Sequence, residues 1–354
     1  MISLLSKPQA INYSESLPDI ILTSDKPSVS CSIKLSGATI VDERFDMGPH
    51  GIPVKIRLRK LLDHLLLNEQ PQYHLSISTH PEAVKTFQVI LNDSDDDPVD
   101  FEFQMINGFN RFQPYDLPFF FRNNWLNITP NAIEAYFHQP LFLSAFPDRG
   151  LEVKVKATMQ NGTIKTETLG SFVPGIIQST NVNPGRLQQI LGDHFKFAEI
   201  FAVDSTNTTV LPKKKIYYRG IYPFKADVFF YLNRLGGWDS LVLNGECIRK
   251  NSSTPSNAII DEVEFQYDSV RKLEFEKTTG FIASNEEQNQ FVEFIYSKSK
   301  FHLYEGSLIP IITSETQVAH THGAVNSYSF TFWPSNTREY YPKLGTLKSN
   351  LSIT

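Results

Sequence analysis

One segment near the middle of the chain constrains its local structure more tightly than any other. From Leu151 to Met159 every second residue is apolar, and Asn161 and Gly162 follow before Ile164 begins a return strand. Alternation with a period of two is the pattern of a strand with one buried face. Asn and Gly tolerate the positive φ angles that a two-residue hairpin turn requires. The pattern therefore predicts an antiparallel hairpin.

The residue composition extends this prediction to the rest of the chain. Among 354 residues there are 27 Phe and 14 Tyr, which favour strands, and 21 Pro and 18 Gly, which favour turns. We therefore expect a mainly β protein made of serial β-sandwich-like domains with a few short helices. We place three domains: residues 1–97 with a short helix, residues 98–216 as a middle β-sandwich-like domain, and residues 217–354 with one capped helix and a polar C-terminal tail.

Local signals place the helices and the domain boundaries. Leucines recur at helical spacing after Arg57, and residues 184–191 combine a first-turn proline with an apolar stripe. Residues 284–287, Ser-Asn-Glu-Glu, form a capping box before a further apolar stripe. The acidic turn at residues 92–98 and the lysine triplet at residues 213–215 indicate the two domain boundaries.

Charge and cysteine content argue against several classes of protein. A formal net charge of −5 is unlike that of a protein that coats nucleic acid. Cys31 and Cys247 are far apart in the sequence, so we expect no structural zinc site, no disulfide framework, and two buried thiols in a reducing cytoplasm. We also expect no signal peptide, and no apolar run approaches the ~18 residues of a membrane span.

A histidine pair has the spacing of metal ligands. His320 and His322 would point to the same side of a strand and could share one ion. No acidic or histidine partner stands at a diagnostic distance from them in the sequence. We therefore interpret residues 319–323 as a polar loop, and we predict that His320 and His322 have no catalytic role.

An acidic stretch resembles the start of a calcium-binding loop. Asp93, Asp95 and Asp97 have the alternate spacing of an EF-hand loop. The sixth position is Pro98, where an EF-hand has glycine, and the twelfth is Gln104, where it has glutamate. We interpret the stretch as a solvated acidic turn, and the presence of a structural calcium ion stays an open question.

Aromatic and basic clusters have structural interpretations. Phe119, Phe120 and Phe121 with Trp125 could bind sugars, but we interpret them as core or as an interface plug. The lysine triplet at residues 213–215 could contact an acidic partner, but we interpret it as part of a connecting edge strand. The sequence contains no phosphate-binding loop, nucleophile elbow or metalloprotease helix. We therefore predict no catalytic, cofactor-binding or metal-binding residue, no cofactor, and a protein that is not an enzyme.

The third region carries a distinctive run of residues. Residues 231–239 read Tyr-Leu-Asn-Arg-Leu-Gly-Gly-Trp-Asp, and we expect the turn at Gly236 to need a positive φ angle. Residues 279–281 precede the capped helix, and Leu-Ile-Pro-Ile-Ile at 308–312 and the strand at 327–333 follow it. In this order the features resemble virion structural proteins of tailed phages and prophages of Bacteroidota hosts, of the distal-tail or tail-tip kind. Residues 51–62 resemble another segment of such proteins.

The resemblance implies a role and no active-site residues. It implies a ring subunit of the virion tail that connects the tail tube to host-recognition components and is assembled in the host cytoplasm. The expected partners are copies of the same chain, with a hexamer favoured, and other phage tail proteins. Contact with a host surface glycan stays open, and we expect no nucleic-acid recognition and no membrane span.

Two other function classes stay in consideration. The first is a β-sandwich carbohydrate-binding or adhesion module, against which the missing export signal counts. The second is a metal-dependent enzyme that uses His320 and His322, which metal analysis of untagged protein would reveal.

Overall fold

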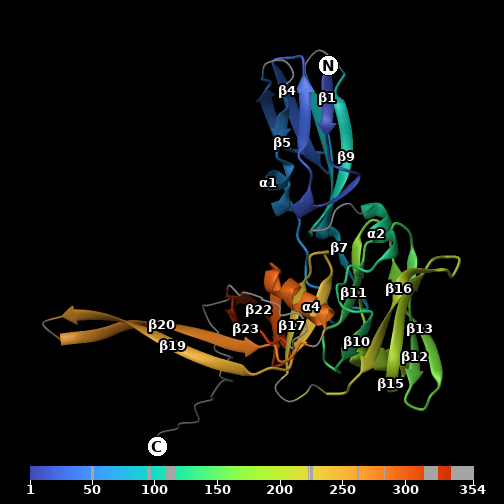
Figure 1. Cartoon of the computed structure of the whole chain (residues 1–354), viewed down its shortest axis with the longest axis vertical. Coiled ribbons are helices and arrows are strands. Elements are labelled where there is room, and N and C mark those ends of the chain that lie inside the picture. Colours follow the sequence, from blue (N-terminus) through green and yellow to red (C-terminus); the bar gives the residue numbers. More distant parts are fainter. Residues whose placement is uncertain are drawn as a thin grey trace, which may run out of the picture. The chain divides into compact units, whose positions relative to one another are not determined.

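The structure is a computed structural model that describes residues 1–48, 52–93, 97–108, 116–221, 223, 226–260, 263–282, 284–314 and 326–335. These residues are mainly in strands and include four short α-helices, so the expected fold class is confirmed (Figure 1). The chain divides into two compact units. The first contains Met1–Ile221 and Leu232–Asp239, and the second contains Tyr222–Tyr231 and Ser240–Thr354.

The N-terminal part of the first unit contains two sheets and a short helix. Its elements are β1 (Ile2–Ser6), β2 (Ile11–Tyr13), β3 (Ile20–Ser24), β4 (Ser28–Leu35), β5 (Ala38–Asp46), β6 (Val54–Ile56), α1 (Leu58–Leu62), β8 (Val84–Asn92) and β9 (Val99–Ile106). The sheet orders are β1-β3-β6 and β2-β9-β8-β4-β5. Alternate residues of both sheets share one buried core, to which Leu22, Ile33 and Phe87 belong. The boundary expected at residue 97 lies between β8 and β9, which pair as antiparallel neighbours.

The middle part of the first unit contains two further sheets. Its elements are β7 (Ile77–His80), α2 (Leu117–Asn123), β10 (Ala132–Ala135), β11 (Phe142–Ala145), β12 (Leu151–Met159), β13 (Ile164–Phe172), β14 (Ile177–Asn181), α3 (Pro184–Leu191), β15 (Phe195–Val203) and β16 (Thr209–Tyr218). The sheet orders are β10-β16-β15-β12-β13 and β11-β14-β7. The core beneath the larger sheet contains Val153, Val155, Ile200 and Ile216.

The predicted hairpin is confirmed as β12 and β13. The two strands pair from Leu151 with Phe172 to Thr158 with Ile164, and Gly162 has a φ angle of +86°. The helix predicted at residues 184–191 is α3, and the side chain of Asn183 caps it by accepting a hydrogen bond from the N–H of Arg186.

The interpretation of the lysine triplet needs a correction. Lys213, Lys214 and Lys215 lie inside β16, which pairs with β10 on one side and β15 on the other. The triplet is therefore in an inner strand, although β10 pairs with it only from Lys215 onward. The boundary expected at residue 216 lies within the same strand.

The second unit contains one seven-stranded sheet and a helix. Its elements are β17 (Asp227–Leu232), β18 (Trp238–Leu243), β19 (Cys247–Ile260), β20 (Val263–Thr278), α4 (Asn285–Tyr296), β21 (Lys300–Tyr304), β22 (Ser307–Thr313) and β23 (Ser329–Pro334). The sheet order is β18-β17-β21-β22-β23-β20-β19, and the turn between β17 and β18 belongs to the first unit. Helix α4 begins at the predicted cap, where the Ser284 hydroxyl accepts a hydrogen bond from the N–H of Glu287. Its apolar residues Phe291 and Phe294 join Phe229 and Phe330 in an aromatic core.

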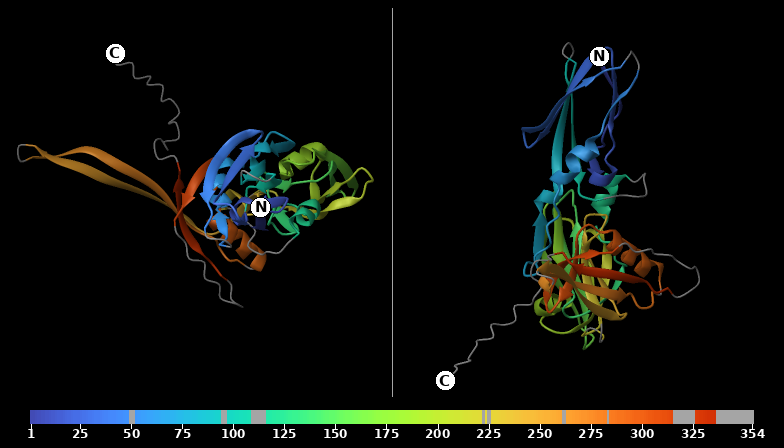
Figure 2. Two further views of the ribbon diagram at one scale, coloured as in Figure 1. Left: turned by 90° about the horizontal axis from the view of Figure 1, so that it is seen from above. Right: turned by 90° about the vertical axis from the view of Figure 1, so that its left-hand side faces the viewer.

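Strands β19 and β20 form a two-stranded ribbon that extends beyond the rest of their sheet (Figures 1 and 2). They pair with each other from Cys247 and Lys277 to Ile260 and Val263. Among the strands that the structure describes, β20 has a second neighbour only from Phe275 to Thr278, where it pairs with β23. At about 3.3 Å per residue, the unsupported part of the ribbon is about 35 Å long.

Candidate functional site

The turn between β17 and β18 is built around one buried side chain of the first unit. The side-chain oxygen of Asn233 accepts hydrogen bonds from the N–H groups of Leu235 (2.8 Å) and Gly237 (3.1 Å). Its amide nitrogen donates to the carbonyl oxygen of Leu126 (2.8 Å) and to the Asp239 carboxylate (2.6 Å). Asn233 therefore closes the turn from within and ties it to the segment that precedes β10.

Asp239 is the second buried residue of this cluster, with 1% of its surface exposed. Its carboxylate accepts hydrogen bonds from the side-chain amide of Asn127 (2.8 Å) and the N–H of Ile128 (3.0 Å), in addition to Asn233. Burial raises the pKa of Asp239, and these hydrogen bonds offset part of the rise. The carboxylate is occupied by protein donors, so its role here is to hold two segments of the chain together.

Two glycines of the turn have no room for a side chain. Gly236 has a φ angle of +86°, which confirms the positive angle expected from the sequence, and an added Cβ would lie 2.8 Å from the carbonyl oxygen of Asn107. A Cβ on Gly237 would lie 2.2 Å from the carbonyl oxygen of Leu126. The residues that carry the resemblance in this turn thus have folding roles.

A buried chain of hydroxyl and imidazole groups also lies in the first unit. The Nε2 atom of His80 is 2.9 Å from the Ser179 hydroxyl, which is 2.8 Å from the Ser144 hydroxyl. Serine beside histidine is the pairing that activates a nucleophile in many hydrolases. Here Ser144 and Ser179 are fully buried and His80 is 2% exposed, so a substrate cannot reach either hydroxyl in this conformation.

His80 should make stability depend on pH. Burial lowers the pKa of His80 from 6.5 to about 4. The unfolded chain therefore binds this proton at higher pH than the folded chain. As a result, the free energy of unfolding is highest above pH 6.5 and decreases as the pH drops toward 4. At about 1.4 kcal/mol per pKa unit, lowering the pH from 7 to 5 should remove about 2 kcal/mol from the free energy of unfolding. Urea unfolding of wild type and His80→Gln at both pH values tests this. An equal pH effect in the two proteins would contradict the assignment.

A buried ion pair lies at the base of the ribbon in the second unit. Lys277, which is fully buried, places its ammonium group 2.5 Å from the Asp227 carboxylate and donates to the carbonyl oxygen of Gly245 (2.7 Å). The Nε2 atom of His302 lies 3.0 Å from the other carboxylate oxygen of Asp227. Burial raises the pKa of Asp227, but hydrogen bonds from His302 and Lys277 and the charge of Lys277 outweigh it, so the pKa is lowered overall.

A small pocket adjoins this ion pair. It has a volume of about 260 Å³ and is lined by Ala226, Asp227, Glu246 and Cys247. Cys247 is partly exposed, and burial together with the charge of Asp227 raises the pKa of its thiol to about 11. Because the thiolate is the reactive form, this cysteine is a poor nucleophile at neutral pH. The pocket supplies carboxylates and an inactive thiol, which favours a structural role.

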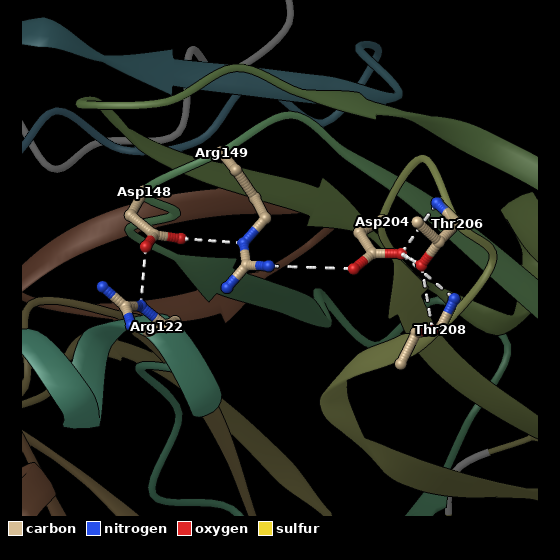
Figure 3. Close-up of polar contacts among 6 residues, drawn as sticks. All are labelled: Arg122, Asp148, Arg149, Asp204, Thr206 and Thr208. Atoms are coloured by element: carbon tan, nitrogen blue, oxygen red, sulfur yellow. Dashed lines mark hydrogen bonds and ion pairs between the residues drawn. The ribbon is translucent and has the colours of Figure 1, made fainter.

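A third polar cluster joins the last turn of α2 to the β11–β12 loop and the β15–β16 loop (Figure 3). The Asp148 carboxylate accepts from Nε of Arg122 (2.6 Å) and of Arg149 (3.2 Å), and a guanidinium nitrogen of Arg149 lies 3.7 Å from Asp204. Asp204 also accepts from the hydroxyl of Thr206 (2.6 Å) and from the N–H groups of Thr206 and Thr208. Hydrogen bonds, of which that of the Thr206 hydroxyl is the strongest, lower the pKa of Asp204. Every charge here has a partner, so the cluster fixes loops.

The remaining sequence candidates have separate locations. His320, His322 and Asp95 lie outside the described residues, as does the polar tail after residue 335. Asp93 is buried and lies 3.4 Å from the N-terminal ammonium group, so this residue differs from the solvated acidic turn that we expected. In the described part of the chain, no three His, Cys, Asp or Glu residues are grouped as a metal site would require. Likewise, none of the described helices could cross a membrane.

The aromatic segment of residues 119–125 divides between core and surface. Phe121 and Trp125 are 2% and 3% exposed, and the indole N–H of Trp125 donates to the carbonyl oxygen of Pro212 (2.7 Å). Phe119 is 63% exposed on the outer side of α2. The interpretation as core is therefore confirmed for Phe121 and Trp125. Phe119 lies outside the core, and its alternative interpretation as an interface plug stays a prediction.

Sequence reasoning missed the ion pair at the base of the ribbon. Leu273, Phe275 and Lys277 alternate in one strand, so Lys277 stands on the face that carries apolar residues. A lysine on such a face is the signal that could have indicated a buried partner. Its partner Asp227 lies 50 positions away in the sequence, and no local pattern connects them.

Comparisons with known proteins give no family. No protein-family model matches the chain, and no curated protein matches it. Among solved structures, a 1.5-MDa bacterial ice-binding adhesin aligns at 11% identity and a TM-score of 0.15, covering 79% of this chain and 92% of the other. DIP-gamma IG1+IG2 aligns at 4% identity and a TM-score of 0.18, covering 63% and 98%. Dpr2 Ig1-Ig2 in complex with DIP-Theta Ig1-Ig3 aligns at 8% identity and a TM-score of 0.17, and the alignment covers 94% of this chain and 89% of the other. With TM-scores this low, the alignments carry no argument about function.

Proposed function

We propose that this protein is a structural subunit of a phage virion, a distal-tail or tail-tip ring component that connects the tail tube to host-recognition components. The observation that carries the proposal is the ribbon of β19 and β20, which extends about 35 Å past the last strand that supports it. The resemblance of residues 231–239 and 308–312 to tail proteins supplies the biological setting.

The ribbon has the properties of an assembly arm. An isolated two-stranded hairpin is only marginally stable in water, because it has no third strand and no core. Among the strands that the structure describes, none pairs with the outer edges of the ribbon beyond Phe275, so their backbone N–H and C=O groups can pair with another chain. The sequence of its far end also contains four apolar residues, Ile259, Ile260, Val263 and Phe265, interspersed with Asp261, Glu262 and Glu264. A neighbouring subunit would complete the pairing and cover these residues, so the arm supports a ring of like subunits.

The buried polar clusters agree with a structural role. In the described residues, the buried carboxylate of Asp239 and the partly exposed carboxylate of Asp227 are both held by protein donors, and the buried hydroxyls of Ser144 and Ser179 are closed to solvent. The hydrogen bonds of these groups are made within the protein, and they fix the fold. A ring subunit works through geometry, so such rigid joints suit it.

Shortening the arm should abolish assembly. We would replace residues 255–269 with Asn-Gly, which joins the paired residues Thr254 and Val270 through a two-residue hairpin turn. Native mass spectrometry should show oligomers for the wild type and monomers for the shortened protein. The melting temperature should stay close to that of wild type, because the removed residues pair with no described strand outside the arm. Oligomers of unchanged size in the shortened protein would refute the assignment of the arm.

A further inference from the structure

The sheet of order β10-β16-β15-β12-β13 carries aromatic rings on the outward face of two neighbouring strands. Phe197 and Phe201 lie on β15 and Tyr217 lies on β16, and all three side chains are partly exposed. Phe197 and Tyr217 are cross-strand partners with ring centroids 5.9 Å apart. Their neighbours along the strands, such as Ala198 and Ile216, point into the core instead. The three rings therefore belong to one surface.

Lysine side chains of β16 lie over these rings. The Nζ atom of Lys215 is 4.2 Å from the ring centroid of Phe197 and 5.2 Å from that of Tyr217. The Nζ atom of Lys213 is 5.7 Å from the ring centroid of Phe201. An ammonium group within about 6 Å of a ring centroid is attracted by the electrons of the ring. The positive charges are thus held beside apolar surface instead of extending freely into solvent.

The same face has an excess of positive charge. Strand β12 adds Lys154 opposite Phe201 and Lys156 opposite Glu199. Glu199 pairs with Lys213 at 3.3 Å, and Glu152 pairs with Lys154 at 3.1 Å. The charged residues of β12, β15 and β16 on this face are therefore four lysines and two glutamates, Lys154, Lys156, Lys213, Lys215, Glu152 and Glu199. Four positive and two negative charges leave a balance of +2, whereas the whole chain has a net charge of −5.

We propose that this face binds an acidic polysaccharide. The C–H face of a sugar ring packs against an aromatic ring, and a carboxylate or sulfate group on the sugar forms a charge-assisted hydrogen bond with a lysine ammonium group. Rings and ammonium groups alternate on strands about 4.8 Å apart, so one extended ligand can meet both kinds of group at once. A neutral glycan would use the rings but would not meet the two positive charges that Glu152 and Glu199 leave unbalanced.

Charge density distinguishes this ligand from nucleic acid. Duplex DNA carries one negative charge per about 1.7 Å, and proteins that bind it normally present a strongly basic surface. A net charge of +2 across three strands suits a polymer whose negative charges are more widely spaced than those of duplex DNA. The inference goes beyond the proposed role in the tail and does not depend on ring assembly, because the whole face lies within one chain.

Affinity electrophoresis of the full chain tests the proposal. The protein would run in native gels that contain polygalacturonate, neutral dextran or poly(dT). Polygalacturonate should retard the wild type, increasingly so at lower salt. The variant Lys213→Gln/Lys215→Gln should bind polygalacturonate about tenfold more weakly, because it loses two ammonium groups at the rings. A second variant, Phe197→Ser/Tyr217→Ser, should lose affinity while keeping all the charges.

The matched control removes the same charge elsewhere in the first unit. Lys7 lies 5.1 Å from the ring centroid of Phe101, and Lys55 pairs with Asp19 at 2.9 Å. Lys7→Gln/Lys55→Gln should bind polygalacturonate like the wild type, and melting curves would confirm that each variant is folded. The proposal is overturned if the wild type is not retarded, if both lysine variants weaken binding equally, or if poly(dT) binds as tightly as polygalacturonate through the same lysines.

Discussion

Replacing Asn233 with alanine is expected to lower the free energy of unfolding by about 3–5 kcal/mol, one of the two largest effects that we predict for a single substitution. The substitution removes the acceptor of the Leu235 and Gly237 N–H groups and a donor to Asp239. Each buried group left without a partner costs about 1–3 kcal/mol, and the Asp239 carboxylate is itself buried. Urea unfolding followed by tryptophan fluorescence measures the change, since Trp238 lies in the same turn.

A matched asparagine provides the control for this prediction. Asn123 donates one hydrogen bond, to the carbonyl oxygen of Phe119 (2.9 Å), at an exposed helix end. Asn123→Ala should change the free energy of unfolding by less than about 0.5 kcal/mol. If Asn233→Ala were as stable as Asn123→Ala, the turn would not have the structural role that its contacts indicate.

Removal of the charge of Asp227 should have a similarly large effect in the second unit. Asp227→Asn keeps the shape of the side chain but removes the negative charge that lies 2.5 Å from the buried ammonium group of Lys277. Breaking a buried ion pair in this way costs about 3–5 kcal/mol. Chemical denaturation should show the loss, and it should destabilise the sheet at the base of the ribbon first.

Two further variants separate the buried charge from general damage. Asp227→Asn/Lys277→Met removes both charges and should recover most of the lost stability, because an apolar pair can replace a buried ion pair at little cost. The exposed pair of Arg219 and Glu134 serves for comparison, and Glu134→Gln should change stability by less than about 1 kcal/mol. A double variant no more stable than Asp227→Asn would show that the unpaired charge is not the cause.

Local signals in the sequence were sufficient for the elements that depend on neighbours in the chain. The hairpin at Gly162, helix α3 and the cap of α4 at Ser284 all depend on contacts within about five residues. In such elements the turn residues and the first-turn caps select the backbone conformation directly. The positive φ angle of Gly236 was also predicted from its local sequence, the Gly-Gly turn.

Pairings between distant segments could not be predicted from the same signals. Strand β7 joins β14 although about 100 residues separate them, and β10 pairs in parallel with β16. The lysine triplet shows the consequence for single residues. Lys214 is 5% exposed and donates to the carbonyl oxygens of Thr129 and Pro130, whereas Lys213 and Lys215 lie on the outward face. Alternation predicts that neighbouring residues face opposite ways, but the sheet neighbours decide which face is buried.

The most direct test of the central claim is electron microscopy of the purified full-length protein at micromolar concentration, together with native mass spectrometry. The account predicts closed rings of identical subunits, with six subunits favoured, in which the ribbon of β19 and β20 contacts the neighbouring subunit. Monomers alone in solution, together with single copies of the chain in intact virions, would contradict it.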